Sequence, residues 1–181
     1  MKYTETKLKG CFVLEPNLFE DNRGHFFESY NKAQFDAGIG AEINFVQDNQ
    51  SFSVKGVIRA IHYQIGKHAQ AKLVRVLHGT VLDVAVDLRK DSPTFGEHFA
   101  VELSHENKKQ LFIPKGFGHG FSVLSDKADF FYKCDNYYNK SAERGIIYND
   151  AHLAIDWKVA KNDIIISEKD MKLLSFKEAL I

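Results

Sequence analysis

Cysteine, proline and net charge are all scarce in this sequence of 181 residues, and the shortages exclude several classes of protein. Its two cysteines, Cys11 and Cys134, are too few for a small disulfide-stapled fold, and we expect reduced thiols in a cytoplasmic protein. Basic and acidic side chains balance at 24 each, so no general positive field exists to hold nucleic acid. Any anionic ligand must therefore be held by a few placed residues.

Long apolar runs are also missing. No stretch of about 18 apolar residues occurs, so we expect no segment to span a membrane. The first seven residues lack the apolar core of a secretory signal. Because no linker, repeat or low-complexity tract interrupts the chain, the sequence predicts one compact domain over residues 1–181.

Short apolar runs rich in Val, Ile, Phe and Tyr, separated by turn residues, occupy the chain from Gly10 to about Tyr138. The clearest pair is 72–77 and 81–88, with a tight turn at 78–80. The second run alternates apolar residues with Asp83 and Asp87, which predicts one face turned inward. Further strands are expected at 10–15, 25–30, 44–53, 56–64, 95–103, 110–113, 119–124 and 129–137.

Only two segments, 31–37 and 167–180, have a helical pattern. The second begins at Ser167 with acidic residues in its first turn, which is typical of a capped helix start. So many short strands with so few helices predict an all-β sandwich or barrel with short flanking helices.

Lys72 opens its strand on the same face as Val74 and Val76. A lysine on an apolar face costs free energy unless it is paired or used, so this position marks a candidate site.

Two histidine motifs resemble the two-part signature of the cupin superfamily, whose fold is a jelly roll or double-stranded β-helix. The first motif runs from Gly56 to His62, and the second is the turn at 113–118 that leads into His119. Metal-binding members take two His and one Glu from the first motif and one His from the second. Here Gln64 stands in place of the second His, and no Glu follows four residues later. We therefore expect a site without a metal.

A longer set of ordered motifs resembles the dTDP-4-dehydrorhamnose 3,5-epimerase family, from 19–24 to 167–170. The resemblance implies cofactor-independent epimerisation of a dTDP-linked 4-keto-6-deoxyhexose at C3 and C5, for supply of dTDP-L-rhamnose to surface polysaccharide. It also implies a homodimer. The motifs are 45–49, 56–64, 72–76, 83–89 and 92–96.

The same resemblance implies four catalytic residues. Inverting a carbon next to a ketone needs a base, an acid on the opposite face and a group that holds the enolate. His62 is implied as the base and Asp170 as its hydrogen-bonded partner. Tyr132 is implied as the acid, and Lys72 as the charge that stabilises the oxyanion.

Nine further positions match the family's substrate contacts. Arg23 and Arg59 are implied to grip the diphosphate, for which a planar guanidinium is suited. Tyr138 is implied to stack on thymine. The remaining contacts implied are Glu28, Gln47, Asn49, His119, Glu143 and Lys169.

Local geometry adds two expectations. Arg59 and His62 are three residues apart, which in a regular strand places them on opposite faces. A bulge or strong twist near Ala60 would bring both to one site. The family's usual glycines are replaced here by Ala60 and Ala71, and we expect each added methyl group to narrow the pocket slightly.

Three alternatives stay open. A relative that inverts only C3 would keep the same base, acid and lysine. A metal-dependent cupin enzyme would need a replacement ligand, for which His68 is the nearest candidate. A catalytically silent sugar-binding module would not need His62, Tyr132 and Lys72 together.

Overall fold

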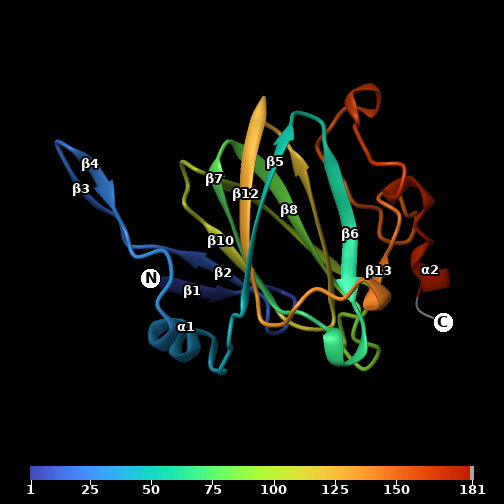
Figure 1. The fold of residues 1–181 in the computed structure, drawn as a ribbon, viewed down its shortest axis with the longest axis horizontal. Helices are drawn as coiled ribbons and strands as arrows, with labels where there is room; N and C mark the ends of the chain where they lie inside the picture. The colour runs from blue at the N-terminus through green and yellow to red at the C-terminus, as the bar shows by residue number, and fades with distance from the viewer. Residues whose placement is uncertain (180–181) are drawn as a thin grey trace.

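Two antiparallel sheets pack face to face in the computed structural model, which describes residues 1–179 (Figure 1). This is the cupin jelly roll, so the predicted all-β class is confirmed. A separate hairpin joins β3 (Phe19–Asp21) to β4 (Gly24–Phe26). The six-stranded sheet contains, in spatial order, β1 (Lys2–Glu5), β2 (Phe12–Glu15), β10 (Gln110–Ile113), β7 (Lys72–His78), β12 (Lys127–Cys134) and β5 (Gln47–Val54), and the five-stranded sheet contains β13 (Glu143–Gly145), β6 (Ile58–Gln64), β11 (Phe117–Val123), β8 (Thr80–Asp87) and β9 (His98–Ser104).

Most strands fall within the predicted runs, and the chain turns tightly at Gly79 between β7 and β8 as expected, although these two strands belong to different sheets. Gly79 has a φ of 81°, a left-handed conformation that glycine adopts without a steric penalty. A Cβ at this position would also lie 2.0 Å from the carbonyl oxygen of Lys127. The sequence prediction missed β1, β3 and β13, and the runs at 25–30 and 129–137 form strands over only part of their length.

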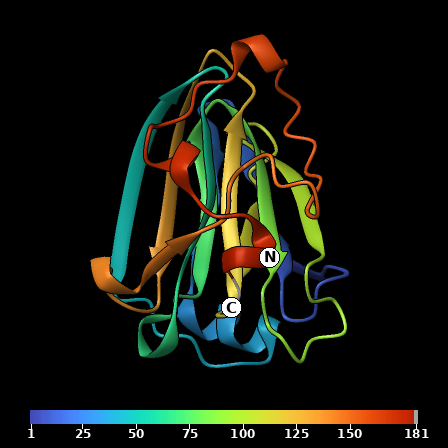
Figure 2. The same cartoon turned by 90° about the vertical axis from the view of Figure 1, so that its right-hand side faces the viewer.

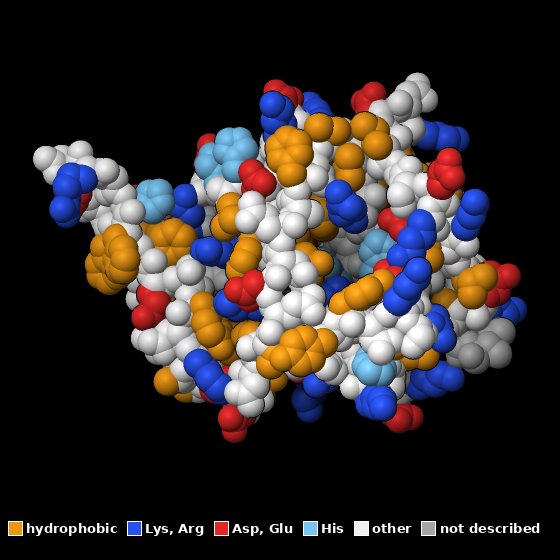
Figure 3. Space-filling view, in the orientation of Figure 1, with side chains coloured by type: hydrophobic (Ala, Val, Ile, Leu, Met, Phe, Trp, Pro, Cys, Tyr) orange, Lys and Arg blue, Asp and Glu red, His pale blue; other side chains and the backbone are white. Residues whose placement is uncertain are grey.

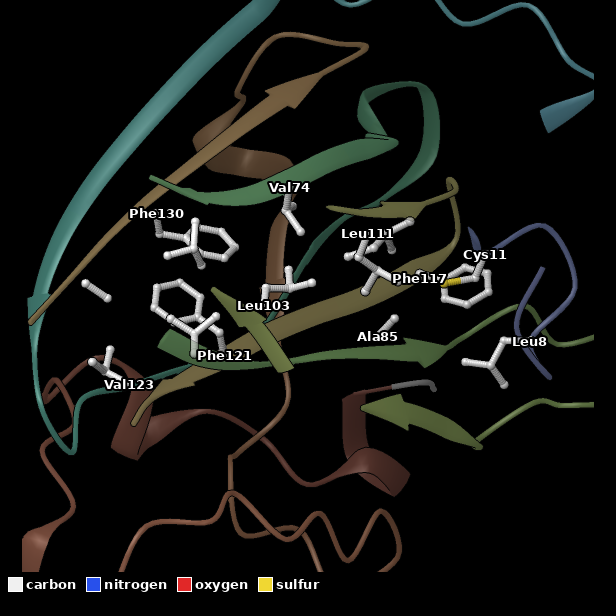
Figure 4. Close-up of a cluster of buried hydrophobic side chains, with 14 residues drawn as sticks. Leu8, Cys11, Val74, Ala85, Leu103, Leu111, Phe117, Phe121, Val123 and Phe130 are labelled. Atoms are coloured by element: carbon white, nitrogen blue, oxygen red, sulfur yellow. The ribbon is translucent and has the colours of Figure 1, made fainter. Parts of the chain in front are cut away.

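The main core fills the space between the two sheets (Figure 4). Val74 and Phe130 from the six-stranded sheet meet Ala85 and Phe121 from the five-stranded sheet, and all four are buried. The rings of Phe121 and Phe130 stack with centroids 4.2 Å apart. Burying each such ring contributes about 1.5–3 kcal/mol, so this layer holds the two sheets together.

Strand β8 is buried on both faces, which corrects the prediction of a single inward face. Leu82 and Val84 pack against Ile146 and Trp157 from the C-terminal segment, which covers the outside of the five-stranded sheet (Figure 2). The opposite face of β8, with Asp83, points between the sheets. The alternation of residues along β8 was predicted correctly, but the face that carries Asp83 and Asp87 is buried rather than exposed to solvent.

The first predicted helix is present as α1 (Lys32–Ile39), and Asn31 caps it by accepting a hydrogen bond from the backbone N–H of Gln34. Its Phe35 covers the outside of the six-stranded sheet. Three short 3-10 turns, η1 (Gly66–His68), η2 (Lys140–Ala142) and η3 (Lys161–Asp163), connect other elements.

The predicted helix over 167–180 is wrong. This region holds only a 3-10 turn, η4 (Asp170–Lys172), and one helical turn, α2 (Phe176–Ala179); residue 180 lies outside the described residues. Between them Leu174 pairs in parallel with Ile146, which extends the chain and interrupts the helix. No helix within residues 1–179 is long and apolar enough to cross a membrane.

Candidate active site

A cavity of about 370 Å³ opens between the two sheets. In Figure 3 it is visible as a hollow near the centre of the face, with Lys or Arg side chains around it. Strands from both sheets and the loop after β12 form its walls. Nine of the thirteen residues predicted for the site line it: Gln47, Asn49, Arg59, His62, Lys72, His119, Tyr132, Tyr138 and Glu143.

His62 and Asp170, 108 residues apart in sequence, form a hydrogen-bonded pair at the cavity wall. The His62 Nε2 atom lies 2.9 Å from an Asp170 carboxylate oxygen. Asp170 is 5% exposed, and its backbone N–H donates to the Ser167 hydroxyl. The turn that begins at Ser167 therefore aims the carboxylate at the imidazole, although no long helix follows it.

A bulge in β6 explains how Arg59 and His62 reach the same cavity. His62 pairs with His119 and Arg59 pairs with Phe121, so three steps along β6 match two steps along β11. One extra residue in β6 reverses the alternation between the two side chains. The expected bulge near Ala60 is confirmed.

Ala60 and Ala71 do not narrow the cavity, which corrects that expectation. Ala60 is fully buried with Ile58 and Val84, under the C-terminal segment. Ala71 is buried near Phe112, on the outside of the six-stranded sheet. Both lie outside the residues that line the cavity.

Lys72 and Tyr132 face the cavity from neighbouring strands of the six-stranded sheet. The Lys72 ammonium lies 5.8 Å from the centre of the Tyr132 ring. Burial lowers the pKa of Lys72, and burial raises the pKa of Tyr132. The phenol is therefore held in its protonated form, as a proton donor must be.

A second imidazole–carboxylate pair, His119 and Asp83, lies deeper between the sheets. The His119 Nε2 atom is 3.0 and 3.2 Å from the two Asp83 oxygens, and Asp83 is fully buried. Burial lowers the pKa of His119 more than Asp83 raises it, which favours a neutral ring. Sequence reasoning missed Asp83 because its alternation with valines is also the pattern of a solvated strand face.

The mouth of the cavity is held by a chain of polar contacts. Tyr138 donates its hydroxyl to Glu143 at 2.9 Å, and the Lys169 ammonium contacts the same carboxylate oxygen at 2.7 Å. Hydrogen bonds from both neighbours lower the pKa of Glu143 although burial raises it. Gln47 accepts the backbone N–H of Tyr138 and donates to Asn49. Lys169, the residue before Asp170 in the chain, does not line the cavity but is linked to it by this contact with Glu143.

Arg59 is held at the cavity without a carboxylate partner in the described part of the chain. Its Nε donates to the Ser53 hydroxyl at 3.2 Å. A guanidinium anchored by a neutral hydroxyl keeps its positive charge available to an anion.

Arg23 and Glu28 are not brought to this cavity. Arg23 lies on the β3–β4 hairpin, which extends away from both sheets (Figure 1), and its exposed side chain pairs with Asp21. Glu28 follows the hairpin and accepts a hydrogen bond from Asn31.

The candidate replacement ligand, His68, is not brought to the cavity. Within residues 1–179 no three His, Cys, Asp or Glu side chains are grouped closely enough to hold a metal ion. His68 lies in η1, outside the cavity lining, and contributes its backbone carbonyl to a hydrogen bond from Gln64.

This site defines a jelly-roll isomerase, because a histidine paired with a carboxylate shares one cavity with a half-buried tyrosine and a half-buried lysine. The model of the family described as dTDP-4-dehydrorhamnose 3,5-epimerase matches residues 5–178. The chain belongs to this family.

Individual members of the family are similar to this chain in sequence and structure along nearly its whole length. The dTDP-4-dehydrorhamnose 3,5-epimerase of Shigella flexneri is 49% identical, covering 99% of this chain and 98% of the relative. The crystal structure of the Elizabethkingia anophelis enzyme is 53% identical, with a TM-score of 0.96 over 100% and 99% of the two chains. A Legionella pneumophila enzyme in complex with dTDP-4-keto-L-rhamnose is 46% identical, with a TM-score of 0.93 over 97% and 93%.

Proposed function

We propose that this chain epimerises dTDP-4-dehydro-6-deoxy-D-glucose at C3 and C5, without a cofactor, to dTDP-4-dehydro-L-rhamnose. The observation that carries the proposal is the cavity shared by His62–Asp170, Tyr132 and Lys72. These groups meet the needs of the reaction, because both C3 and C5 lie next to the C4 ketone. The product would enter the supply of dTDP-L-rhamnose for surface polysaccharide.

Proton abstraction is assigned to His62. Asp170 accepts a hydrogen bond from the Nε2 side of the ring, so Nδ1 is left to take the proton from the sugar carbon. The nearby carboxylate then stabilises the imidazolium that forms. The departing electron pair moves toward the C4 oxygen, where Lys72 stabilises the enolate charge.

Reprotonation is assigned to Tyr132. Its phenol donates a proton to the carbon from the face opposite His62, which inverts the centre. Burial, which raises the phenol pKa, keeps it protonated until the enolate is formed.

Binding of the nucleotide part of the substrate is assigned to the residues at the opening of the cavity. Arg59 carries a charge free for the diphosphate, and Tyr138 exposes 54% of its surface there, enough for a base to stack on. The hydrogen-bonding groups of Gln47, Asn49, His119, Glu143 and Lys169 supply the other contacts.

Deuterium wash-in tests the proposal. The sugar nucleotide is incubated with metal-stripped protein in D₂O, and proton NMR follows C3 and C5. Exchange at both carbons is expected. Exchange at C3 alone would replace the proposal with a 3-epimerase. If neither carbon exchanges while the nucleotide sugar is bound, a binding module becomes the better account, and activity that returns only on adding metal would favour the metal-dependent alternative.

A homodimer is the second part of the proposal. The β3–β4 hairpin exposes Phe19 by 64% and Phe26 by 71%, and a second copy would bury these rings. The hairpin also carries Arg23 away from its own cavity, and Glu28 follows it. We infer that both residues serve the cavity of the partner copy.

Mixing two inactive variants tests this arrangement. Arg23→Ala removes the guanidinium carried by the hairpin, and His62→Ala removes the base of the cavity. If each hairpin serves the other copy, a mixed dimer contains one site that lacks both residues and one that is intact, so the mixture should regain activity. A mixture that exchanges subunits but stays as inactive as its components would contradict the proposed exchange.

A cytoplasmic location completes the proposal. Cys11 and Cys134 are both free and buried, which supports a reducing compartment.

A further inference from the structure

Gln64 occupies the place of a metal ligand in the cupin motif, yet its amide is fully engaged with backbone. The residue ends β6, two positions after His62, and is 8% exposed. Its Nε2 donates to the carbonyl oxygens of His68, at 2.8 Å, and Tyr137, at 3.3 Å. Its Oε1 accepts the backbone N–H of Asn139 at 2.6 Å.

The segment that Gln64 holds is the mouth loop, which we define as residues 135–139, between β12 and η2. Two of the three hydrogen bonds fall on Tyr137 and Asn139, immediately before and after Tyr138. Asn139 in turn caps η2 by accepting the backbone N–H groups of Ser141 and Ala142. One side chain of the five-stranded sheet thus fixes the backbone on both sides of Tyr138.

The six-stranded sheet holds the same loop from the other side. Gln47, the first residue of β5, accepts the N–H of Tyr138 itself at 3.0 Å. The Tyr138 ring remains exposed while its backbone is held at three consecutive residues. The Tyr138 ring is therefore already in position when a ligand arrives, which reduces the conformational entropy that the loop loses on binding.

We propose that Gln64 is a positioning residue for nucleotide binding, which holds the mouth loop so that Tyr138 is presented to the base. The inference rests on the proposed function for the role of Tyr138. Gln64 itself does not touch the reacting carbons in this assignment. Its loss should therefore weaken binding of the nucleotide rather than slow proton transfer.

The test compares Gln64→Leu with wild type in two assays. Calorimetry with dTDP measures affinity without any epimerase activity, and steady-state kinetics with the sugar nucleotide separate KM from kcat. We expect the variant to bind dTDP about tenfold more weakly and to raise KM by a similar factor, with kcat changed by less than about threefold. Ser122→Ala, which removes a buried hydrogen bond to the Trp157 carbonyl outside the cavity, should keep the wild-type affinity.

A double-mutant cycle separates positioning from general stability. Tyr138→Ala removes the group that Gln64 is proposed to hold, so adding Gln64→Leu to it should weaken dTDP binding by less than about a further twofold. If Gln64→Leu does not fold, Gln64→Glu provides the same comparison. It keeps the acceptor for Asn139 but places a carboxylate against the Tyr137 carbonyl, and it should also weaken dTDP binding.

The inference is overturned if Gln64→Leu melts at a lower temperature but binds dTDP as tightly as wild type. It is also overturned if the Gln64 and Tyr138 effects are fully additive. Failure of the proposed function gives a different result, because wild type would then fail to exchange deuterium at both C3 and C5, whatever Gln64→Leu does to dTDP binding.

Discussion

His62 and His119 lie directly opposite each other on β6 and β11, and each ring contacts a different carboxylate. Their surroundings differ. The His119 side chain is 8% exposed and bonds to Asp83, whereas the His62 side chain is 28% exposed and bonds to Asp170. Burial lowers the pKa of His119 and favours its neutral form. The more open ring of His62 is therefore the more accessible of the two to a molecule in the cavity.

Replacing His62 by alanine should lower the rate by about 10² to 10⁴, the usual contribution of a general base. The measurement is deuterium wash-in at C3 and C5, with circular dichroism to show that the fold survives. His68→Ala is the matched control, because His68 lies outside the cavity lining. Wild-type turnover by the His62 variant, or loss of activity in the control, would show that the base is misassigned.

Removing only the phenol oxygen of Tyr132, as Tyr132→Phe, should separate exchange from inversion. His62 can still take and return a proton on its own face, so deuterium enters the substrate while the epimerised product fails to accumulate. Proton NMR distinguishes the two signals. Tyr148→Phe, a change in the packing beneath the C-terminal segment, should behave as wild type. Normal product formation by Tyr132→Phe would assign the acid to another group.

Lys72→Met should make the protein more stable and less active. Burial lowers the pKa of Lys72, so the charged form is less favourable in the folded chain than in the unfolded chain. A methionine of similar length removes this cost, and we expect the melting temperature at neutral pH to rise by a few degrees while epimerisation is lost.

The increase in stability expected for Lys72→Met should depend on pH in a defined direction. The cost of charging Lys72 is fully present below its lowered folded-state pKa and disappears as pH rises to the ordinary value for lysine. The stability advantage of Lys72→Met should therefore shrink on moving to alkaline pH. A melting temperature below that of wild type at neutral pH would contradict the explanation.

Asp87→Asn should destabilise the fold more at neutral pH than in acid. Asp87 is fully buried, and although burial raises its pKa, hydrogen bonds from Arg89, Ser92 and Thr94 lower it to about 2. A depressed pKa contributes stability above the unfolded value, and this contribution is lost as pH falls from about 4 to about 2.

Urea unfolding at pH 6 and pH 3 checks this prediction. The variant should lose on the order of 2 kcal/mol at pH 6, and the difference should narrow at pH 3. Asp91→Asn, at an exposed position of the following turn, should change stability by less than about 0.5 kcal/mol. An equal loss for Asp87→Asn at both pH values would assign its effect to packing rather than to charge.

Much of the architecture was predictable because it depends on local patterns. Period-two alternation identified β8, and the turn chemistry of Gly79 placed the tight turn that precedes it. The spacing of Arg59 and His62 predicted a bulge, since two residues of one site must share a face. By contrast, the helix over 167–180 was wrongly predicted because the pairing of Leu174 with Ile146 overrides the local helical pattern.

The sequence by itself determined the strand pattern, the motifs that identify the family and the loss of a metal ligand at Gln64, because these are properties of residue type and spacing. Only the tertiary structure decided that Asp83 is buried beside His119, that Arg23 lies away from its own cavity, and that Gln64 holds the loop of Tyr138. Such contacts join residues 36 to 108 positions apart in the two imidazole–carboxylate pairs. Local pattern cannot report them, since they arise only when two sheets close around a shared interior.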